Sequence, residues 1–172
     1  FRDQGHTLVV VASDSEIRLY DTTSWQSRSV SVPPNARQYA PTPILSPDER
    51  FLLYVGYNET IHWVDLESAV TDTIPTHQTW TVLDMAFSPD GRLFATSSGE
   101  GTVSLWDSDR RDVVEVFRGH LLGVHAVAFS PDGQRLASGS KGEEAVKLWD
   151  IETRHEVATL PGEGILSSQL KF

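Results

Sequence analysis

Two short motifs recur along the chain with a period of about 43 residues. The first is Phe-Ser-Pro-Asp-Gly at 87–91 and 129–133, with a weaker copy, Leu-Ser-Pro-Asp-Glu, at 45–49. The second is a triplet that carries a large apolar or aromatic residue before an aspartate and closes at Asp21, Asp65, Asp107 and Asp150. These aspartates are 44, 42 and 43 residues apart. Two independent markers that keep one period indicate tandem structural repeats.

Each period carries the pattern of four short strands separated by turns. In the last period the predicted strands are 124–129, 134–140, 145–149 and 156–160. Ser-Pro-Asp-Gly is a turn signal, because proline presets φ and glycine adopts φ > 0 without strain. Short strands with turns every 8 to 12 residues and no helical periodicity predict an antiparallel all-β array. One such sheet is too small to be stable alone, so neighbouring sheets must stack.

Composition excludes several classes of function. The 172 residues include no cysteine, 14 basic and 24 acidic side chains, and the net charge is −10. A disulfide framework and a thiolate metal site are therefore impossible. Nucleic acid and anionic membrane surfaces are disfavoured as partners, since they require clustered Lys and Arg. The longest uncharged apolar run, Leu8 to Ala12, is far shorter than the roughly 20 residues of a membrane span.

The repeats resemble a known family. A period near 43, a Gly-His pair at Gly119 and His120 ahead of one strand, and Trp-Asp at the end of another are similar to the WD40 repeat, a four-stranded propeller blade. The resemblance covers the whole chain and is weaker in the first two periods, where Tyr20 and Val64 precede the aspartate. It implies an all-β WD40 β-propeller with four blades in one unit, 1–172. The expected blades are 1–34 (strands b, c and d), 35–76, 77–119 and 120–162, followed by a surplus strand a at 163–172.

The resemblance also implies a hydrogen-bonded set inside each blade. Its members are the Gly-His histidine, a Ser or Thr of strand b, the Trp of strand c and an Asp in the b–c turn. The fourth period supplies His120, Ser138 or Ser140, and Trp149. The third supplies His77, Thr96 or Ser98, and Trp106. Only the first period has Asp at the turn position, Asp14, where the others carry Asn58, Glu100 and Glu143. Because no period has the complete set, we expect rigidity to depend mainly on apolar packing.

Catalysis and metal binding find little support in the sequence. Ser, His and Asp occur in one period, but the resemblance places them in a packed blade rather than around an exposed nucleophile. His120 and His125 would need a third metal ligand from elsewhere, and no zinc-binding spacing is present. We therefore predict a chain that is not an enzyme and that has no metal and no cofactor.

Propellers of this family bind mainly through the face that carries the d–a and b–c loops. On this face the spacing places mostly large apolar or aromatic residues, namely Trp80, Tyr39, Tyr57, Leu122 and Ile165, together with Gln38. Such side chains are typical interface anchors, although they could instead cover the central channel. The function expected is a scaffold for a protein or peptide, as a regulatory or assembly module. The alternative is a propeller enzyme or a small-molecule or glycan binder that uses the channel, which the apolar strand-a residues Leu83, Met85, Ala126 and Val127 disfavour.

The phase of the repeats suggests how a ring could close. The first period lacks strand a, and residues 163–172 have the pattern of a surplus strand a. Closure within one chain would give four blades, and closure between two chains would give a homodimeric ring of eight blades. The chain could also be part of a longer propeller. We favour the dimer and expect a cytoplasmic location, from the lack of cysteine and the likeness to bacterial WD40 arrays.

Overall fold

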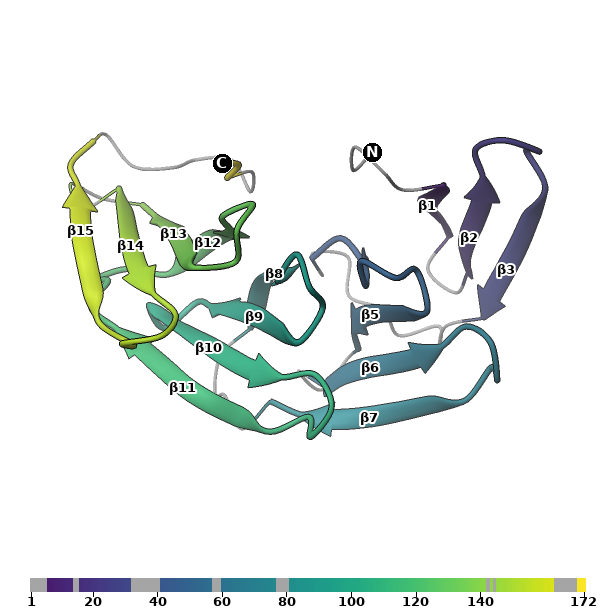
Figure 1. The fold of residues 1–172 in the computed structure, drawn as a ribbon, viewed down its shortest axis with the longest axis horizontal. Helices are drawn as coiled ribbons and strands as arrows, with labels where there is room; N and C mark the ends of the chain where they lie inside the picture. The colour runs from purple at the N-terminus through teal and green to yellow at the C-terminus, as the bar shows by residue number, and fades with distance from the viewer. Residues whose placement is uncertain are drawn as a thin grey trace. The chain divides into compact units, whose positions relative to one another are not determined.

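The computed structural model describes residues 6–13, 16–31, 41–56, 60–76, 81–141, 143, 145–162 and 170–172. Within these ranges the chain forms strands and turns (Figure 1), and no helix occurs there that could cross a membrane. The chain divides into two compact units, Phe1–Thr76 (unit 1) and His77–Phe172 (unit 2). The all-β fold class predicted from the repeats is confirmed.

Unit 1 contains two antiparallel sheets. Sheet 1 has the order β1-β2-β3, and sheet 2 has the order β4-β5-β6-β7. The strands are β1 (Thr7–Ser13), β2 (Glu16–Asp21), β3 (Ser27–Ser31), β4 (Ile44–Leu45), β5 (Phe51–Val55), β6 (Thr60–Asp65) and β7 (Thr71–Pro75). Each strand pairs with its neighbour in sequence, as expected for a meander.

Unit 2 contains two four-stranded antiparallel sheets, sheet 3 (β8 to β11) and sheet 4 (β12 to β15). Their strands are β8 (Val82–Phe87), β9 (Leu93–Ser98), β10 (Thr102–Asp107), β11 (Val113–Arg118), β12 (Val124–Phe129), β13 (Arg135–Ser140), β14 (Val146–Asp150) and β15 (Glu156–Leu160). Residues 163–169 of the predicted surplus strand lie outside the described part of the chain.

The Ser-Pro-Asp-Gly motif builds the turn between the first two strands of sheets 3 and 4. In sheet 3, the Ser88 hydroxyl donates to the Asp90 carboxylate at 2.7 Å and accepts the Leu93 N–H at 3.0 Å. Gly91 has φ +73° and the matching Gly133 of sheet 4 has φ +71°, a region that disfavours side chains. The motif therefore supplies both the hydroxyl and the glycine that this turn needs.

The aspartate that ends each repeat triplet caps the following turn. The Asp107 carboxylate accepts the N–H groups of Asp109 and Arg110 at 3.0 and 2.8 Å. Asp21, Asp65 and Asp150 accept backbone N–H groups two or three residues ahead in the same way. Side-chain capping of this kind is the ordinary role of Asp at turns, so the aspartates are explained by structure alone.

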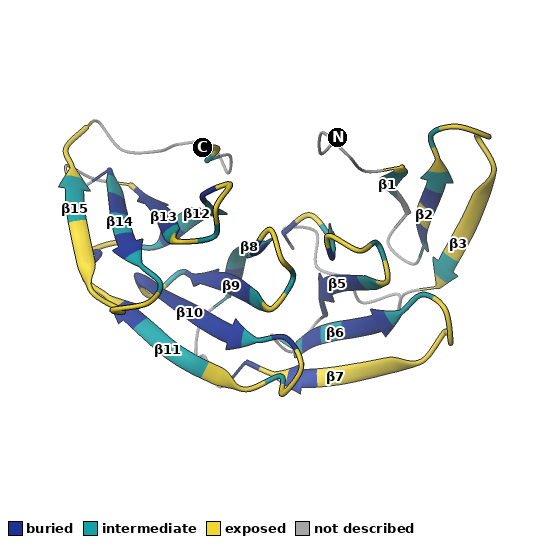
Figure 2. Cartoon of the chain, viewed as in Figure 1, coloured by how far each residue is buried: buried dark blue, intermediate teal, exposed yellow. Residues whose placement is uncertain are grey.

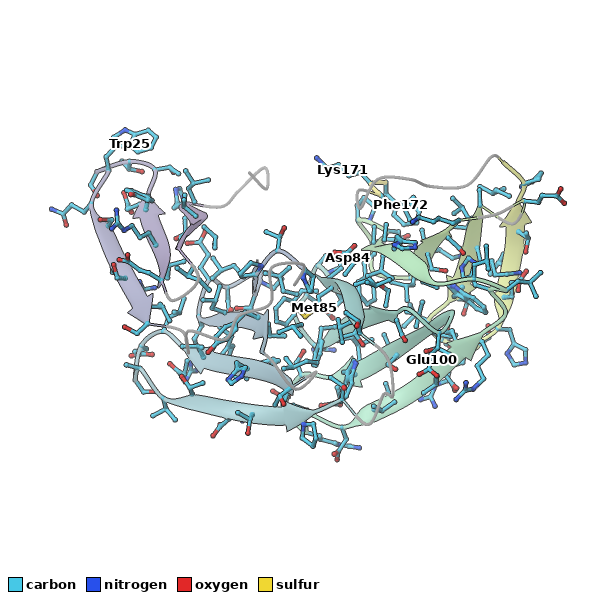
Figure 3. The ribbon with its side chains drawn as sticks, turned by 180° about the vertical axis from the view of Figure 1, so that it is seen from behind. Trp25, Asp84, Met85, Glu100, Lys171 and Phe172 are labelled. Atoms are coloured by element: carbon cyan, nitrogen blue, oxygen red, sulfur yellow. The ribbon has the colours of Figure 1, made fainter. Side chains whose placement is uncertain are left out.

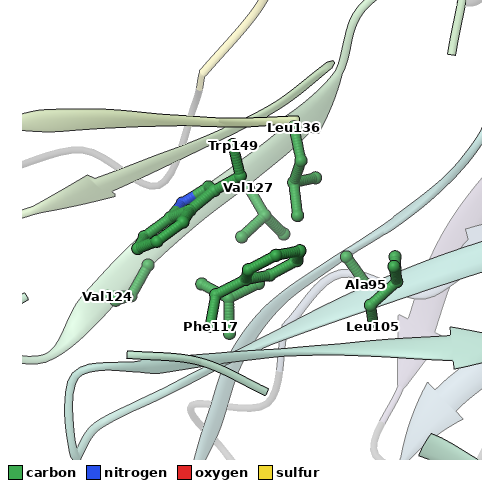
Figure 4. Close-up of a cluster of buried hydrophobic side chains, with 8 residues drawn as sticks. Ala95, Leu105, Phe117, Val124, Val127, Leu136 and Trp149 are labelled. Carbon is green, nitrogen blue, oxygen red and sulfur yellow. The ribbon is translucent and has the colours of Figure 1, made fainter. Parts of the chain in front are cut away.

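Each unit has its own apolar core between its two sheets. In unit 2, Ala95, Val103, Leu105 and Phe117 of sheet 3 pack against residues of sheet 4 (Figure 4). The sheet 4 residues are Val124, Val127, Leu136 and Trp149. In unit 1 the core consists of Ile17, Leu19, Leu52, Tyr54 and Val64. Figure 2 shows the buried positions on the middle strands of the sheets and the exposed ones on the outer strands and turns.

Candidate functional site

The loop that joins β11 to β12 presents two leucines to solvent. Residues 119–123 read Gly-His-Leu-Leu-Gly, and the side chains of Leu121 and Leu122 are 86% and 52% exposed. Leu121 is the most exposed of the large apolar residues in the described part of the chain. We refer to residues 119–123 as the leucine loop. Exposed apolar side chains at one place are a mark of an interaction site.

A buried hydrogen-bonded set holds the start of this loop. Nε2 of His120 lies 2.7 Å from the Ser138 hydroxyl, and Nε1 of Trp149 donates to the same hydroxyl at 2.8 Å. The three residues are 8%, 0% and 4% exposed. A buried network of this kind fixes side-chain positions, because breaking it leaves polar groups without water. The structure thus brings together His120, Ser138 and Trp149, with Ser138 as the hydroxyl.

The end of the leucine loop is held through its backbone. The Ser140 hydroxyl lies within hydrogen-bond distance of the carbonyl oxygens of Leu122 and Gly123, at 3.2 and 3.1 Å. Gly101, in the turn between β9 and β10, has φ +85°, and a Cβ there would lie 2.8 Å from the His120 carbonyl oxygen. A Cβ on Gly123 would lie 2.9 Å from the Gly99 carbonyl oxygen. The loop therefore rests directly on the β9–β10 turn, and only glycines allow this approach.

Sheet 3 carries a smaller version of the same set. Nε1 of Trp106 donates to the Thr96 hydroxyl at 3.0 Å, and both residues are buried. Ser98, the alternative hydroxyl, accepts the N–H of Glu100 instead. His77 lies outside the described residues.

Most of the predicted rim falls outside the described part of the chain. This applies to Gln38, Tyr39, Tyr57, Trp80 and Ile165, and also to the turn acid Asp14. Leu122 is described and exposed, as a binding residue needs to be. The sequence prediction did not include Leu121, because counting back a fixed number of residues from each strand selects one position per loop. The sequence pattern that could have indicated Leu121 is the pair of adjacent leucines between Gly-His and a glycine.

The sequence prediction also did not select a half-buried carboxylate on the first strand of sheet 3. Asp84 lies beside Met85 on β8 (Figure 3), and its Oδ2 accepts the N–H of Val127 in β12 at 2.9 Å. Burial is the main cause that raises the pKa of Asp84 to about 6. His125, at a bulge in β12, has a pKa lowered first by burial and then by Lys141. Asp84 links sheet 3 to sheet 4, which is a structural use of a carboxylate.

Potential metal ligands are scattered in the part of the chain that the structure describes. No three His, Asp or Glu residues gather there closely enough to hold a metal ion.

Repeated antiparallel four-stranded sheets, with a buried Trp bonded to a Ser or Thr hydroxyl, define a chain of propeller-type repeats. The family model "WD domain, G-beta repeat" matches residues 68–107 and 111–150. The chain belongs to the WD40-repeat family. The two matched segments include the repeats whose tryptophans form the hydrogen bonds described above.

Known proteins with WD repeats resemble the chain over much of its length. It is 31% identical over 142 residues to periodic tryptophan protein 2 of Arabidopsis thaliana. The matched region covers 81% of this chain and 16% of that protein. It is 38% identical over 93 residues to transducin beta-like protein 3 of Bos taurus, covering 54% and 12%. The solved structure of U3-55K has a TM-score of 0.67 and 26% identity, covering 73% of this chain and 40% of that one. The chain thus spans less than a fifth of either of these two relatives.

Proposed function

We propose that the chain is a non-catalytic interaction scaffold that binds a protein or peptide through the leucine loop. The main support for this proposal is that the leucine loop combines an exposed apolar side chain with a neighbouring residue that is held rigidly. Leu121 is 86% exposed, while the neighbouring His120 is buried and hydrogen-bonded. Family membership supports the same function, because WD40 repeats are interaction modules rather than enzymes.

The energetics of such a site are favourable. Burying one leucine side chain contributes roughly 1.5–3 kcal/mol, so two adjacent leucines can anchor a partner. A loop whose backbone is already fixed loses little conformational entropy on binding. The other predicted rim residues, among them Trp80 and Tyr39, lie outside the described ranges and stay predictions.

The non-catalytic part of the proposal rests on how the reactive residue types are used. Ser138 has no exposed surface, and its hydroxyl already contacts His120 and Trp149. A serine nucleophile needs access to substrate and an adjacent oxyanion hole. Asp84, the half-buried carboxylate on β8, accepts a hydrogen bond from a backbone N–H of the next sheet. We therefore prefer the loop surface to an enzymatic or small-molecule site on the inner strands.

Pairing of two chains remains part of the proposal. The sequence suggests a homodimer that closes an eight-bladed ring, with a longer propeller chain as the alternative.

Selection of displayed peptides tests the loop surface without a known partner. A random peptide library is selected on the wild-type chain, and the recovered peptides are measured against a Leu121→Asp/Leu122→Asp chain. We expect apolar peptides that bind the double variant at least tenfold more weakly. The matched control is Val70→Asp, since Val70 is 55% exposed on a turn of unit 1. Peptides that bind all three chains equally would contradict the proposal.

A further inference from the structure

A groove of about 680 Å³ lies within unit 2, between the Ser-Pro-Asp-Gly turns of sheets 3 and 4. Pro89 and Leu93 line it from sheet 3, and Pro131 and Ile151 line it from sheet 4. The two turns approach closely, since a Cβ on Gly133 would lie 3.6 Å from Cδ of Pro89. Leu93 and Ile151 also pack against the core of unit 2, which holds the two walls together. We call this groove, with its apolar walls, the turn groove.

Asp107, the triplet aspartate of sheet 3, lines the turn groove at the end of β10. In sheets 2 and 4 the triplet aspartate caps the following turn through Oδ1 and binds an arginine through Oδ2. These pairs are Arg50 with Asp65, at 2.9 Å, and Arg135 with Asp150. Asp107 caps its own turn through Oδ1 in the same way, but within the described ranges it forms no ion pair. Oδ2 of Asp107 thus lacks the guanidinium that its equivalents bind.

The sequence of sheet 3 explains why this guanidinium is missing. In sheet 4 the arginine comes from the residue opposite the aspartate, and in sheet 3 that residue is Leu93. In sheet 2 the arginine comes from one residue earlier. Its counterpart in sheet 3, Arg92, lies toward Asp90 instead, with Nε 3.8 Å from Oδ2 and 85% of the side chain exposed. An exposed pair at this distance is weak, so it supplies no substitute at Asp107.

The charge of the turn groove favours a cation. Its charged residues are three carboxylates and one guanidinium, namely Asp90, Asp107, Asp132 and Arg92, which gives a formal balance of −2. Asp107 is half-buried, so an ion pair there is screened less by salt than a fully exposed one. No three acidic or histidine side chains of the described residues gather closely enough for a metal ion, so an organic cation fits this groove better.

We propose that the turn groove binds an arginine side chain of a partner peptide, with the guanidinium at Oδ2 of Asp107. The methylene stem of that arginine contacts Pro89, Pro131 and Ile151, since such stems pack on apolar surface while the charged end stays polar. An arginine is expected rather than a lysine, because a planar guanidinium donates two hydrogen bonds in one plane. Arg50 shows this geometry, with Nε and Nη2 both donating to Oδ2 of Asp65.

The turn groove is separate from the leucine loop. Strand β12 begins after the leucine loop and ends at the turn of sheet 4 that lines the groove, so the two surfaces lie at opposite ends of this strand. The inference therefore goes beyond the proposed function and does not depend on it.

Titration of the full chain with two matched peptides tests the charge requirement. The probes are acetyl-Ala-Leu-Arg-Leu-Ala-amide and the same peptide with citrulline, which has the shape of arginine but no charge. We expect the arginine peptide to bind about fivefold more tightly or better. In spectra of the ¹⁵N-labelled chain it should shift the amides of Asp109 and Arg110, which donate to Asp107. Equal affinity of the two peptides, or no binding of the arginine peptide, overturns the proposal.

Substitutions in the chain test the position. Asp107→Asn keeps an oxygen for the cap and removes the charge, so it should weaken the arginine peptide about fivefold. The matched control is Asp150→Asn, the same change at an aspartate that already pairs with Arg135, and it should leave the affinity unchanged. Equal losses from the two variants overturn the assignment to Asp107. If Asp107→Asn fails to fold, the citrulline comparison on the wild-type chain still decides.

Two further variants separate this proposal from its alternatives. Arg92→Gln removes the one cation that lines the groove and should tighten the arginine peptide, whereas weaker binding would contradict the balance of charge described above. Leu121→Asp/Leu122→Asp should leave the arginine peptide unaffected. A loss of binding in that double variant would place the arginine peptide on the leucine loop and overturn the turn groove as its site.

Discussion

Unit 1 and unit 2 fill the same repeat positions with different chemistry. In unit 2 the tryptophans of β10 and β14 donate hydrogen bonds to Thr96 and Ser138. In sheet 2, strand pairing places Tyr54 at the hydroxyl position and Val64 at the tryptophan position. Both belong to the apolar core of unit 1. The comparison shows that the positions of a hydrogen-bonded tryptophan and hydroxyl in unit 2 can be filled by residues of the apolar core in sheet 2.

The aromatic groups of sheet 2 are rearranged as a consequence. Trp63 stands one position earlier than the tryptophans of unit 2 and contacts Phe51, with ring centroids 5.2 Å apart. The ring of His62 stacks on Tyr54 at 4.6 Å. A Cβ on Gly56 would lie 2.3 Å from Nε2 of His62, so glycine is required for this stack.

The turn after the first strand of the sheet also differs between sheet 2 and the two sheets of unit 2. Gly91 and Gly133 adopt positive φ in unit 2, whereas sheet 2 has Glu49 at φ +59°. The Glu49 carboxylate accepts hydrogen bonds from the N–H of His6 and from the N–H and hydroxyl of Thr7. A strained residue is thus held by contacts that join sheet 2 to sheet 1.

The largest difference in stability between the two units is expected when a large aromatic side chain is removed from equivalent positions. Trp149→Ala leaves a large cavity and removes a hydrogen bond, so we expect a loss of about 3–5 kcal/mol in the free energy of unfolding. Tyr20→Ala, at the equivalent position of sheet 1, should cost clearly less, since Tyr20 is only half-buried. Urea unfolding followed by circular dichroism measures both. Equal losses would show that the two positions are equally packed.

Asp84 should make unit 2 less stable as the pH rises. Burial raises its pKa to about 6, above the ordinary aspartate value of 3.8, so the folded state holds the proton more tightly than the unfolded state. The stability that this gives is complete below pH 3.8 and is lost as the pH passes 6. Asp84→Asn should therefore stabilise the protein by roughly 2–3 kcal/mol at pH 7.5 and leave it unchanged below about pH 4. Thermal unfolding across this range measures the difference, and a pH-independent effect would contradict it.

His62 should give unit 1 the opposite pH dependence. Burial lowers the pKa of His62, so the unfolded state binds the proton more readily. The contribution of His62 to stability is present above the ordinary histidine pKa of 6.5 and is lost as the pH falls below it. His62→Gln should flatten the loss of stability between about pH 7 and pH 5. An unchanged profile would show that His62 is not desolvated.

Two substitutions at Glu49 distinguish the cost of its positive φ from the contribution of its hydrogen bonds to β1. Glu49→Gly relieves the positive φ but removes the hydrogen bonds to β1, so we expect a net loss of about 1–2 kcal/mol. Glu49→Ala removes the bonds and keeps the strain, and should cost about 1 kcal/mol more than the glycine variant. Thermal melts of the three chains measure this order. A glycine variant more stable than wild type would show that the contacts to His6 and Thr7 contribute little.

The smallest effect is expected at the turn that follows Asp65. Ala69 has φ +57° and is exposed. Ala69→Gly should stabilise the protein by about 0.5–1 kcal/mol, because glycine adopts this conformation without steric cost. Ala69→Val, which is β-branched, should lower the melting temperature. The opposite order would argue against the left-handed conformation.

The repeat pattern predicts the regular parts of the fold well. The strands predicted for the last period agree with β12 to β15 to within one residue, because Ser-Pro-Asp-Gly and Trp-Asp fix the turns on either side. The pairing of Trp149 with Ser138 rather than Ser140 required strand register, which the sequence leaves open. Asp84 and Glu49 were not predicted, since their partners lie about 40 residues away on another sheet. The exposure of Leu121 likewise depends on how the loop rests on Gly101.

Hydrogen exchange of the full chain, read by mass spectrometry on peptides from each strand, tests most directly whether unit 2 is the rigid base of the leucine loop. The buried hydrogen bonds and the two covered faces of sheet 3 predict slower opening than in sheet 1, which has three strands and one uncovered face in the described residues. We expect the amides of β10 and β14 to exchange at least tenfold more slowly than those of β2. Amides of β2 that exchange as slowly as those of β10 would contradict the account.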